Sequence, residues 1–250
     1  MNTTTLRLAF GDGQHADVTY SDYQGTKPYL LLHGGGGPAT VAGFAALLAD
    51  KKQARVIVPT HPGFQGTPRP EALASVGALA RLYLDLLASL DLRDVTVVGN
   101  SMGGWIAAEM ALANNGRLGA IVLVNAVGVV VPEHPVADVS KLTPPELAKL
   151  SFHNPELMKP PPGAPSGPSP NIPALLAYAG LKMNDPTLLD RLAKITLPTQ
   201  ILWGESDRVV TPDYGRAFAR AIPNARFTLL PEAGHLPQIE APQRLLEAIG

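Results

Sequence analysis

A serine set between glycines is the strongest chemical signal in this 250-residue sequence, in the run G-N-S-M-G-G at residues 99–104. The run follows an apolar segment, Val95–Val98, and precedes an Ala-, Leu- and Met-rich segment, Met102–Ala113. We expect the first to be a buried strand and the second a buried helix. A sharp strand-to-helix turn with a G-x-S-x-G pattern strains the serine backbone and exposes its hydroxyl at the helix N-terminus. The pattern therefore predicts Ser101 as a nucleophile.

A second run, H-G-G-G-G-P at residues 33–38, follows the apolar segment Tyr29–Leu32. It could cradle a phosphate, but it lacks the Gly-Lys-Ser/Thr ending of a P-loop, and Ala39 leaves a G-x-G-x-x-G spacing incomplete. It could also be only a flexible loop. Beside a nucleophilic serine we favour a third interpretation, in which bare backbone N–H groups bind the oxyanion of a tetrahedral intermediate. The expected donors are Gly35 and Met102, with His33 supporting the loop.

Both motifs lie in a chain where short apolar runs alternate with helical patterns. Four runs are nearly continuous, as strands buried on both faces require: Tyr29–Leu32, Arg55–Val58, Val95–Val98 and Ala120–Val124. Before them, Leu6–Phe10 and Ala16–Tyr20 are predicted strands joined by a turn at Gly11-Asp12-Gly13. Between them, the apolar spacing predicts a helix over Leu73–Leu90. The final predicted elements are the strand Thr199–Trp203, the helix Pro212–Ala221, the strand Ala225–Leu230 and the helix Ala241–Ile249.

The alternation is interrupted between the predicted strands Ala120–Val124 and Thr199–Trp203. Residues 155–173 contain eight prolines, which exclude a central strand or a helix interior because proline lacks the N–H and fixes φ. Short helices are predicted on either side, at Pro144–Leu150 and Ile172–Lys182. We therefore predict an α/β fold whose core is formed by residues 1–127 and 191–250, with a mobile lid or cap over residues 128–190.

Composition excludes several classes of protein. Apolar residues make up 46% of the chain, which is enough for a sizeable core. The formal charge of −1 gives no footprint for nucleic acid or an acidic membrane surface. The absence of cysteine excludes disulfides and thiolate chemistry. We expect a cytoplasmic protein without a signal peptide or membrane span. We also expect it to act on a small molecule without a metal or cofactor, and a homodimer is possible.

Two further motifs complete an ordered set: W-G-E-S-D at residues 203–207 and A-G-H at residues 233–235. With the two glycine-rich runs, they resemble the α/β-hydrolase fold superfamily over the whole chain except the Pro-rich insertion. The resemblance implies an eight-stranded, mostly parallel sheet flanked by helices, with the lid after strand 6. It also implies Asp207 as the acid after strand 7 and His235 as the base after strand 8.

The chemistry of a serine nucleophile supports these two residues. Serine needs a histidine to accept its proton, and the imidazole needs a carboxylate to fix its tautomer. The other five histidines precede the core, lie in an early loop or lie in the insertion. Among neighbouring carboxylates, Asp213 suits the first turn of a helix and Glu205 a solvated loop. We therefore predict Ser101, His235 and Asp207 as the catalytic residues.

Three functions remain open. The first is hydrolysis of small-molecule esters through an acyl-enzyme. The second uses the same residues to cleave a C–C bond in a vinylogous diketone, because the elbow and glycine run also resemble hydrolases of aromatic ring-fission products. Those enzymes commonly have an aromatic residue after the histidine, where this chain has Leu236. The third is a non-catalytic protein that senses a ligand on the same fold. Lid residues could line an acyl pocket or simply pack onto the core: Phe152, Leu157, Met158, Leu175, Leu176, Tyr178, Leu181 and Met183.

Overall fold

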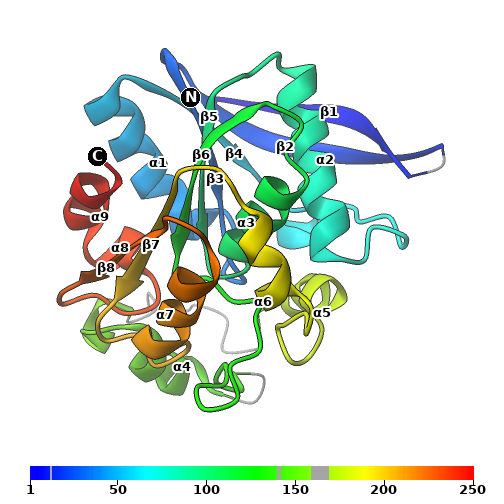
Figure 1. The fold of residues 1–250 in the computed structure, drawn as a ribbon. Coiled ribbons are helices and arrows are strands. Elements are labelled where there is room, and N and C mark those ends of the chain that lie inside the picture. Colours follow the sequence, from blue (N-terminus) through cyan, green and yellow to red (C-terminus); the bar gives the residue numbers. More distant parts are fainter. Residues whose placement is uncertain (12, 140–141, 159–168) are drawn as a thin grey trace.

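Eight strands form one central sheet in the computed structural model (Figure 1), which describes residues 1–11, 13–139, 142–158 and 169–250. The strands are β1 (Asn2–Phe10), β2 (Gln14–Tyr23), β3 (Lys27–Leu32), β4 (Ala54–Pro59), β5 (Val95–Asn100), β6 (Leu118–Val124), β7 (Thr199–Gly204) and β8 (Arg226–Leu230). Their order is β1-β2-β4-β3-β5-β6-β7-β8. Strand β2 runs antiparallel to both of its neighbours, β1 and β4, and the other neighbouring pairs, from β4 across to β8, are parallel. The predicted class, an α/β fold with a mostly parallel eight-stranded sheet, is confirmed.

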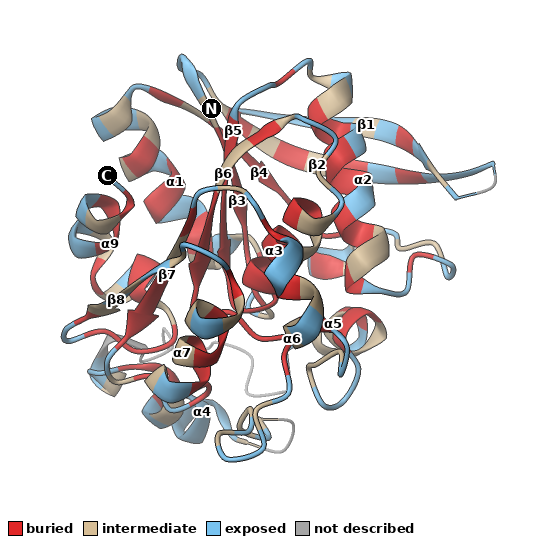
Figure 2. Cartoon of the chain, in the orientation of Figure 1, coloured by how far each residue is buried: buried red, intermediate tan, exposed pale blue. Residues whose placement is uncertain are grey.

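Helices cover both faces of this sheet (Figure 1). One face carries α1 (Ala39–Lys52), α8 (Pro237–Glu240) and α9 (Pro242–Ile249), and the other carries α2 (Val76–Ser89), α3 (Met102–Leu112) and α7 (Pro212–Ala221). Leu30 and Leu32 of β3 join the core under α2 and α3, whereas Tyr29 and Leu31 join the core under α1. Burial on both faces (Figure 2) explains why the strand sequences are continuously apolar.

Helices α1, α2 and α5 illustrate how the structure differs from the sequence predictions. Helix α1 was not predicted, although its buried residues Val41, Phe44, Ala45 and Leu48 follow a helical spacing. Helix α2 begins at Val76 rather than Leu73, because the Ser75 side chain accepts a hydrogen bond from the Ala78 N–H and caps the helix. Helix α5 (Ile172–Ala179) ends before Gly180, whose φ of 66° leaves the helical region.

The chain between β6 and β7 forms several short helices over the predicted insertion: α4 (Pro144–Ser151), η2 (Pro155–Met158), α5, α6 (Leu188–Arg191) and η3 (Leu192–Lys194). Another 3-10 turn, η1 (Phe64–Gly66), follows β4. The most Pro-rich part of the predicted lid, 159–168, and Asp12 of the predicted hairpin turn lie outside the described residues. Among the helices within the described ranges, none is long and apolar enough to cross a membrane.

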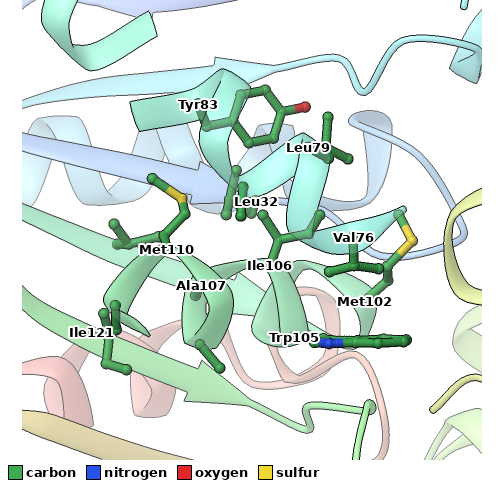
Figure 3. Packing of buried hydrophobic residues seen from close by; sticks show 14 of the residues in the cluster. Leu32, Val76, Leu79, Tyr83, Met102, Trp105, Ile106, Ala107, Met110 and Ile121 are labelled. Atoms are coloured by element: carbon green, nitrogen blue, oxygen red, sulfur yellow. The ribbon is translucent and has the colours of Figure 1, made fainter. Parts of the chain in front are cut away.

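Helix α3 is held in the larger core cluster (Figure 3). The contributing side chains are Met102, Trp105, Ile106, Ala107 and Met110 from α3, Val76, Leu79 and Tyr83 from α2, Leu32 from β3 and Ile121 from β6. Because interiors of this kind are close-packed, α3 has little freedom to shift. The residues before its first turn are therefore held in one position.

Glycines allow the chain to turn from β5 into α3. A Cβ at Gly99 would lie 2.1 Å from the Gly103 carbonyl oxygen, and a Cβ at Gly103 would lie 2.3 Å from the Leu32 carbonyl oxygen. Real Cβ atoms do not approach backbone so closely. In contrast, a Cβ at Gly43 in α1 would meet nothing within 4 Å. Glycine is therefore required at positions 99 and 103, whereas at position 43 it only lowers the stability of helix α1.

We expect Gly99→Ala to lower the free energy of unfolding by about 3 kcal/mol, because the added methyl group must push α3 away from β5. The matched variant Gly43→Ala should raise it by about 0.5–1 kcal/mol, since alanine is the better helix former. Urea unfolding followed by circular dichroism measures both. Equal stability of Gly99→Ala and wild type would contradict the close backbone approach.

Candidate active site

Ser101 lies between β5 and α3 with φ 57° and ψ −119°. This positive φ is uncommon for a residue with a side chain, and such strain persists only where neighbouring structure imposes it. The Ser101 N–H donates to the Val124 carbonyl oxygen at 3.0 Å, and its own carbonyl accepts from the Gly104 N–H at 2.9 Å. The predicted strand, strained serine and helix are therefore present.

Asp207 and His235 form a buried pair. Asp207 follows β7, His235 follows β8, and the His235 Nδ1 lies 2.8 Å from the Asp207 Oδ2. The other carboxylate oxygen accepts from the N–H groups of Val209 and Val210, at 2.8 and 3.0 Å. An ionised carboxylate only accepts, so Nδ1 carries the proton and Nε2 of a neutral ring is free to act as a base.

Two other carboxylates that are close to Asp207 in the sequence, Glu205 and Asp213, do not contact His235. Asp213 forms an exposed ion pair with Arg216 at 2.8 Å, and Glu205 is exposed. Both positions agree with the ordinary roles considered for them. Of the three candidate carboxylates, Asp207 is the one that contacts His235.

Ser101 and His235 are brought together through a neighbouring residue. Within the described ranges, no hydrogen bond joins the Ser101 hydroxyl to the His235 ring. However, the Asn100 Nδ2 donates to the His235 carbonyl oxygen at 2.9 Å, and the Asn100 Oδ1 accepts from the Gln238 Nε2 at 3.1 Å. The residue before Ser101 therefore anchors the histidine loop. Hydrogen bonds between catalytic groups are often long in ligand-free enzymes.

The glycine run passes directly over Ser101. A Cβ at Gly34 would lie 2.8 Å from the Ser101 Cβ and 3.4 Å from its Oγ. In the part of the chain that the structure describes, no group accepts a hydrogen bond from the Gly35 N–H, whereas the Gly37 N–H is bonded to the Gly34 carbonyl oxygen at 3.2 Å. Met102 is the first residue of α3, so its N–H has no partner one turn earlier in the helix. Gly35 follows Gly34, which contacts Ser101, and Met102 follows Ser101 itself; the role of both as oxyanion donors stays a prediction.

Asn125 links three loops of the site and was missed from the sequence. It follows β6 with φ 48° and is fully buried. Its Nδ2 donates to the Asp207 Oδ2 at 2.5 Å and to the Gly234 carbonyl oxygen at 3.0 Å, and its Oδ1 accepts from the Gly204 N–H at 3.1 Å. The sequence did offer a signal for this role. Asn125 is a lone amide at the carboxyl end of an apolar strand, and that strand lies beside the one that bears the acid.

The first helix of the insertion is bonded to the histidine and acid loops. The Ser151 carbonyl oxygen accepts from the His235 N–H at 2.6 Å, and the Leu150 carbonyl oxygen accepts from the Arg208 N–H at 3.1 Å. The Glu240 carboxylate accepts from the N–H groups of His153 and Gly234, at 3.0 and 2.7 Å. The end of α4 is therefore fixed to the acid–base half of the site.

The second helix, α5, is bonded to the glycine-run half. The Asn171 Oδ1 accepts from the Gln65 N–H at 2.9 Å, and the Tyr178 hydroxyl donates to the Pro62 carbonyl oxygen at 2.9 Å. A Cβ at Gly35 would lie 2.9 Å from the Leu175 Cδ2, so Leu175 covers the predicted oxyanion donor.

The other predicted lid side chains divide between packing and exposure. Phe152 is buried, whereas Leu181 is 83% exposed. The side chains of Leu157 and Met158 lie outside the described part.

Two histidines outside this set, His33 and His61, are fully buried. Burial lowers the pKa of His33 to about 4 and lowers the pKa of His61 well below its usual range, because the charged ring would lose its hydration. Both rings are therefore neutral at pH 7. Among the described residues, no group of three His, Cys, Asp or Glu side chains is arranged to hold a metal ion.

Removal of the Asn125 amide should damage both stability and activity. We expect Asn125→Ala to lower the free energy of unfolding by about 3 kcal/mol, because it leaves the buried Gly204 N–H and Gly234 carbonyl unpaired. Any turnover should fall at least tenfold, on the order of the loss of one charge-assisted hydrogen bond to Asp207. Asn184, whose half-buried amide donates to the nearby Lys182 carbonyl oxygen at 3.0 Å, offers a control outside the site: Asn184→Ala should lower stability much less and leave turnover unchanged. Wild-type turnover in Asn125→Ala would contradict this role.

Stability should depend on the buried His33 in mildly acidic solution. The unfolded chain protonates this ring below its ordinary pKa of 6.5, whereas the folded chain does so only near 4. Stability is therefore full above pH 6.5 and falls by up to about 3 kcal/mol as the pH drops to 4. In urea titrations, His33→Gln should show a shallower loss over this range than wild type. His15→Gln, at an exposed site, should keep the wild-type slope.

The chain is similar to several known hydrolases. A 2-hydroxy-6-oxononadienedioate/2-hydroxy-6-oxononatrienedioate hydrolase of Cupriavidus pinatubonensis is 27% identical over 259 residues, which cover 86% of this chain and 83% of that protein. Lipase 3 of Moraxella sp. is 27% identical over 266 residues, covering 96% and 81%. The structure of a thermophilic esterase from Thermogutta terrifontis has a TM-score of 0.77 and 24% identity, covering 98% and 96%.

A family model gives the broader assignment. The model of the alpha/beta hydrolase family matches residues 29–248, a range that begins within β3 and includes Ser101, Asn125, Asp207 and His235. The resemblance stated from the four motifs is confirmed, as is the fold. The chain belongs to the alpha/beta hydrolase family.

Proposed function

We propose that this protein is a serine hydrolase that cleaves small-molecule esters through Ser101, His235 and Asp207. The observation that carries the proposal is the strained Ser101, with its Oγ against Gly34 and its neighbour Asn100 bonded to the loop of the buried His235–Asp207 pair. A strained backbone at this turn is retained against a free-energy cost, which supports a functional role for the serine.

The mechanism follows from the direction of each hydrogen bond. Because the His235 Nδ1–H is held by Asp207, its Nε2 accepts the proton of Ser101 as the hydroxyl turns toward the ring and attacks the ester carbonyl. The oxyanion of the tetrahedral intermediate is bound by the N–H groups of Gly35 and Met102. His235 then gives the proton to the leaving alcohol. Water, activated by the same ring, hydrolyses the acyl-Ser101 ester.

Ester cleavage is supported by the relative from Moraxella sp., which is named a lipase. A second candidate is favoured by the relative from Cupriavidus pinatubonensis, whose name states hydrolysis of a 2-hydroxy-6-oxo dienedioate. On this alternative, the same three residues cleave a C–C bond beside a carbonyl in a vinylogous diketone. A protein that only senses a ligand would keep the fold without an activated serine.

A fluorophosphonate probe tests the proposal directly. We expect one stoichiometric adduct by intact mass on wild type and none on Ser101→Ala, whose unfolding free energy should stay within about 1 kcal/mol of wild type because the backbone is unchanged. Turnover in Ser101→Ala should fall by at least about 10⁴-fold. Ser151→Ala, which removes another buried hydroxyl next to the site, should still be labelled.

The outcomes separate the three functions. Turnover of short p-nitrophenyl esters with labelled Ser101 supports the ester hydrolase, whereas labelling with turnover of vinylogous diketones alone supports C–C cleavage. In a folded protein, failure of the probe to react with Ser101 would overturn both and favour ligand sensing. His235→Ala combined with Ser101→Ala should be no slower than either single variant, because the residues act in one step. Additive losses of rate in the double variant would contradict the proposal that Ser101 and His235 act in one step.

A further inference from the structure

A buried pair of histidines lies beneath the glycine run, outside the Ser101, His235 and Asp207 set. His33 begins the glycine run after β3, and His61 follows β4. Their ring centroids are 3.7 Å apart, at an interplanar angle of 32°. Both side chains are fully buried, so neither can meet a substrate. Their role must therefore be exerted through the groups to which they are bonded.

The tautomer of each ring follows from its partners. His33 Nε2 accepts from the His61 backbone N–H at 3.2 Å, so the proton of neutral His33 lies on Nδ1, which donates to the Gly34 carbonyl oxygen at 2.8 Å. His61 Nε2 lies 2.9 Å from the His33 carbonyl oxygen, which can only accept, so Nε2 carries the proton of His61. His61 Nδ1 must then accept from the Tyr83 hydroxyl at 2.5 Å.

Tyr83 is a fixed starting point for this chain of hydrogen bonds. It lies on α2 within the core cluster that holds α3 (Figure 3), and it is fully buried. Burial raises the pKa of its phenol well above the usual range, so the hydroxyl keeps its proton and donates. Tyr83 thus fixes the His61 ring, which donates to the His33 carbonyl oxygen. The His61 backbone N–H in turn donates to the His33 ring, which donates to the Gly34 carbonyl oxygen.

The last bond in this chain controls one peptide plane. The Gly34 carbonyl and the Gly35 N–H belong to the same planar peptide, and they point in opposite directions when the bond is trans. The Gly34 oxygen accepts from the His33 Nδ1–H at 2.8 Å and from the Gly37 N–H at 3.2 Å, so these two bonds together set the direction of the Gly35 N–H. If the His33 proton moved to Nε2, it would meet the His61 N–H, and Nδ1 would face the Gly34 oxygen without a proton between them.

We propose that His61 is a positioning residue: its ring, held by Tyr83, fixes the His33 backbone carbonyl, and its backbone N–H selects the His33 tautomer that helps to aim the Gly35 N–H at the oxyanion formed on a substrate of Ser101. The inference rests on the proposed function, because it takes Gly35 as an oxyanion donor. It assigns a catalytic consequence to two buried side chains that touch neither substrate nor reacting atoms. It also explains why a glycine run can present a fixed N–H although its backbone is free of side-chain constraints.

Nitrogen-15 NMR of histidine-labelled wild type tests the tautomers without any substrate. The two ring nitrogens of neutral histidine have separate signals when protonated and unprotonated, so the spectra identify the proton position. His33→Gln and His61→Gln assign the signals by their loss. We expect His33 with its proton on Nδ1 and His61 with its proton on Nε2. The opposite tautomer in either ring would overturn the proposal.

Kinetics of Tyr83→Phe test the consequence. Without the hydroxyl, His61 Nδ1 has no hydrogen-bond donor. We expect kcat to fall at least tenfold, while KM stays within twofold of wild type. This loss of kcat is smaller than the one caused by complete removal of an oxyanion donor, because the Gly35 N–H is misaligned rather than absent. Phenylboronic acid, which forms a tetrahedral adduct on an active serine, should bind more weakly by the same factor. Tyr214→Phe is the matched control. It removes a buried hydroxyl bonded to the Val129 carbonyl oxygen at 2.8 Å, away from the glycine run.

The control separates positioning from simple loss of stability. If Tyr83→Phe and Tyr214→Phe lower Tm alike and leave kcat and boronic acid binding within twofold of wild type, His61 and Tyr83 only fill the core and the proposal fails. If Tyr83→Phe does not fold, His61→Gln, which keeps a donor for the His33 carbonyl, is compared with His61→Ala. Partial rescue of kcat by glutamine is then expected, and equal loss would overturn the proposal.

The fluorophosphonate result distinguishes this failure from failure of the proposed function. An unlabelled wild-type protein would remove the hydrolase assignment while leaving the NMR tautomers intact. A labelled and active wild type with unaffected Tyr83→Phe would keep the hydrolase assignment and remove the positioning role.

Discussion

Backbone atoms of β5, α3 and the glycine run approach one another around Ser101 at distances that exclude side chains. Gly99 lies against the Gly103 carbonyl, Gly103 against the end of β3, and Gly34 against Ser101 itself. These contacts impose the positive φ of the serine, because α3 cannot move away without disturbing a close-packed core. The serine is thus the fixed point of the site, and every other group must be brought to it by the loops of neighbouring strands.

Parallel strands make this convergence possible, since their carboxyl ends meet at one edge of the sheet. β3, β5, β6, β7 and β8 are followed there by His33, Ser101, Asn125, Asp207 and His235 respectively. Asn125 connects the last two loops, because its amide bonds the acid, the histidine loop and the end of β7 together. The ends of β5, β6, β7 and β8 therefore contribute a connected polar network above an apolar core, and the loss of one member leaves others unpaired.

The sequence predicted those parts of the site whose chemistry is visible in local order. Strand, glycine-flanked Ser101 and helix are contiguous, and the order of the motifs gave Asp207 and His235, which the structure pairs. Asn125 and His61 were not predicted, because an amide or imidazole in a loop acquires its role only through partners 82 or 22 residues away. Helix α1 was missed although its apolar spacing is helical, since it begins directly after the glycine run.

Ester hydrolysis and C–C bond hydrolysis place the same demand on the fixed part of this site. On the proposed mechanism each forms an oxyanion beside Ser101, so the glycine run and the helix N-terminus would serve either reaction. The preference for one reaction over the other must therefore arise from residues that contact the parts of the substrate farther from Ser101. Leu175 of α5 lies over Gly35, and α5 is itself bonded to the loop after β4 through Asn171 and Tyr178. On the proposed function, we therefore expect α5 to influence the choice of substrate, because it lies beside Gly35 and is anchored to the loop after β4.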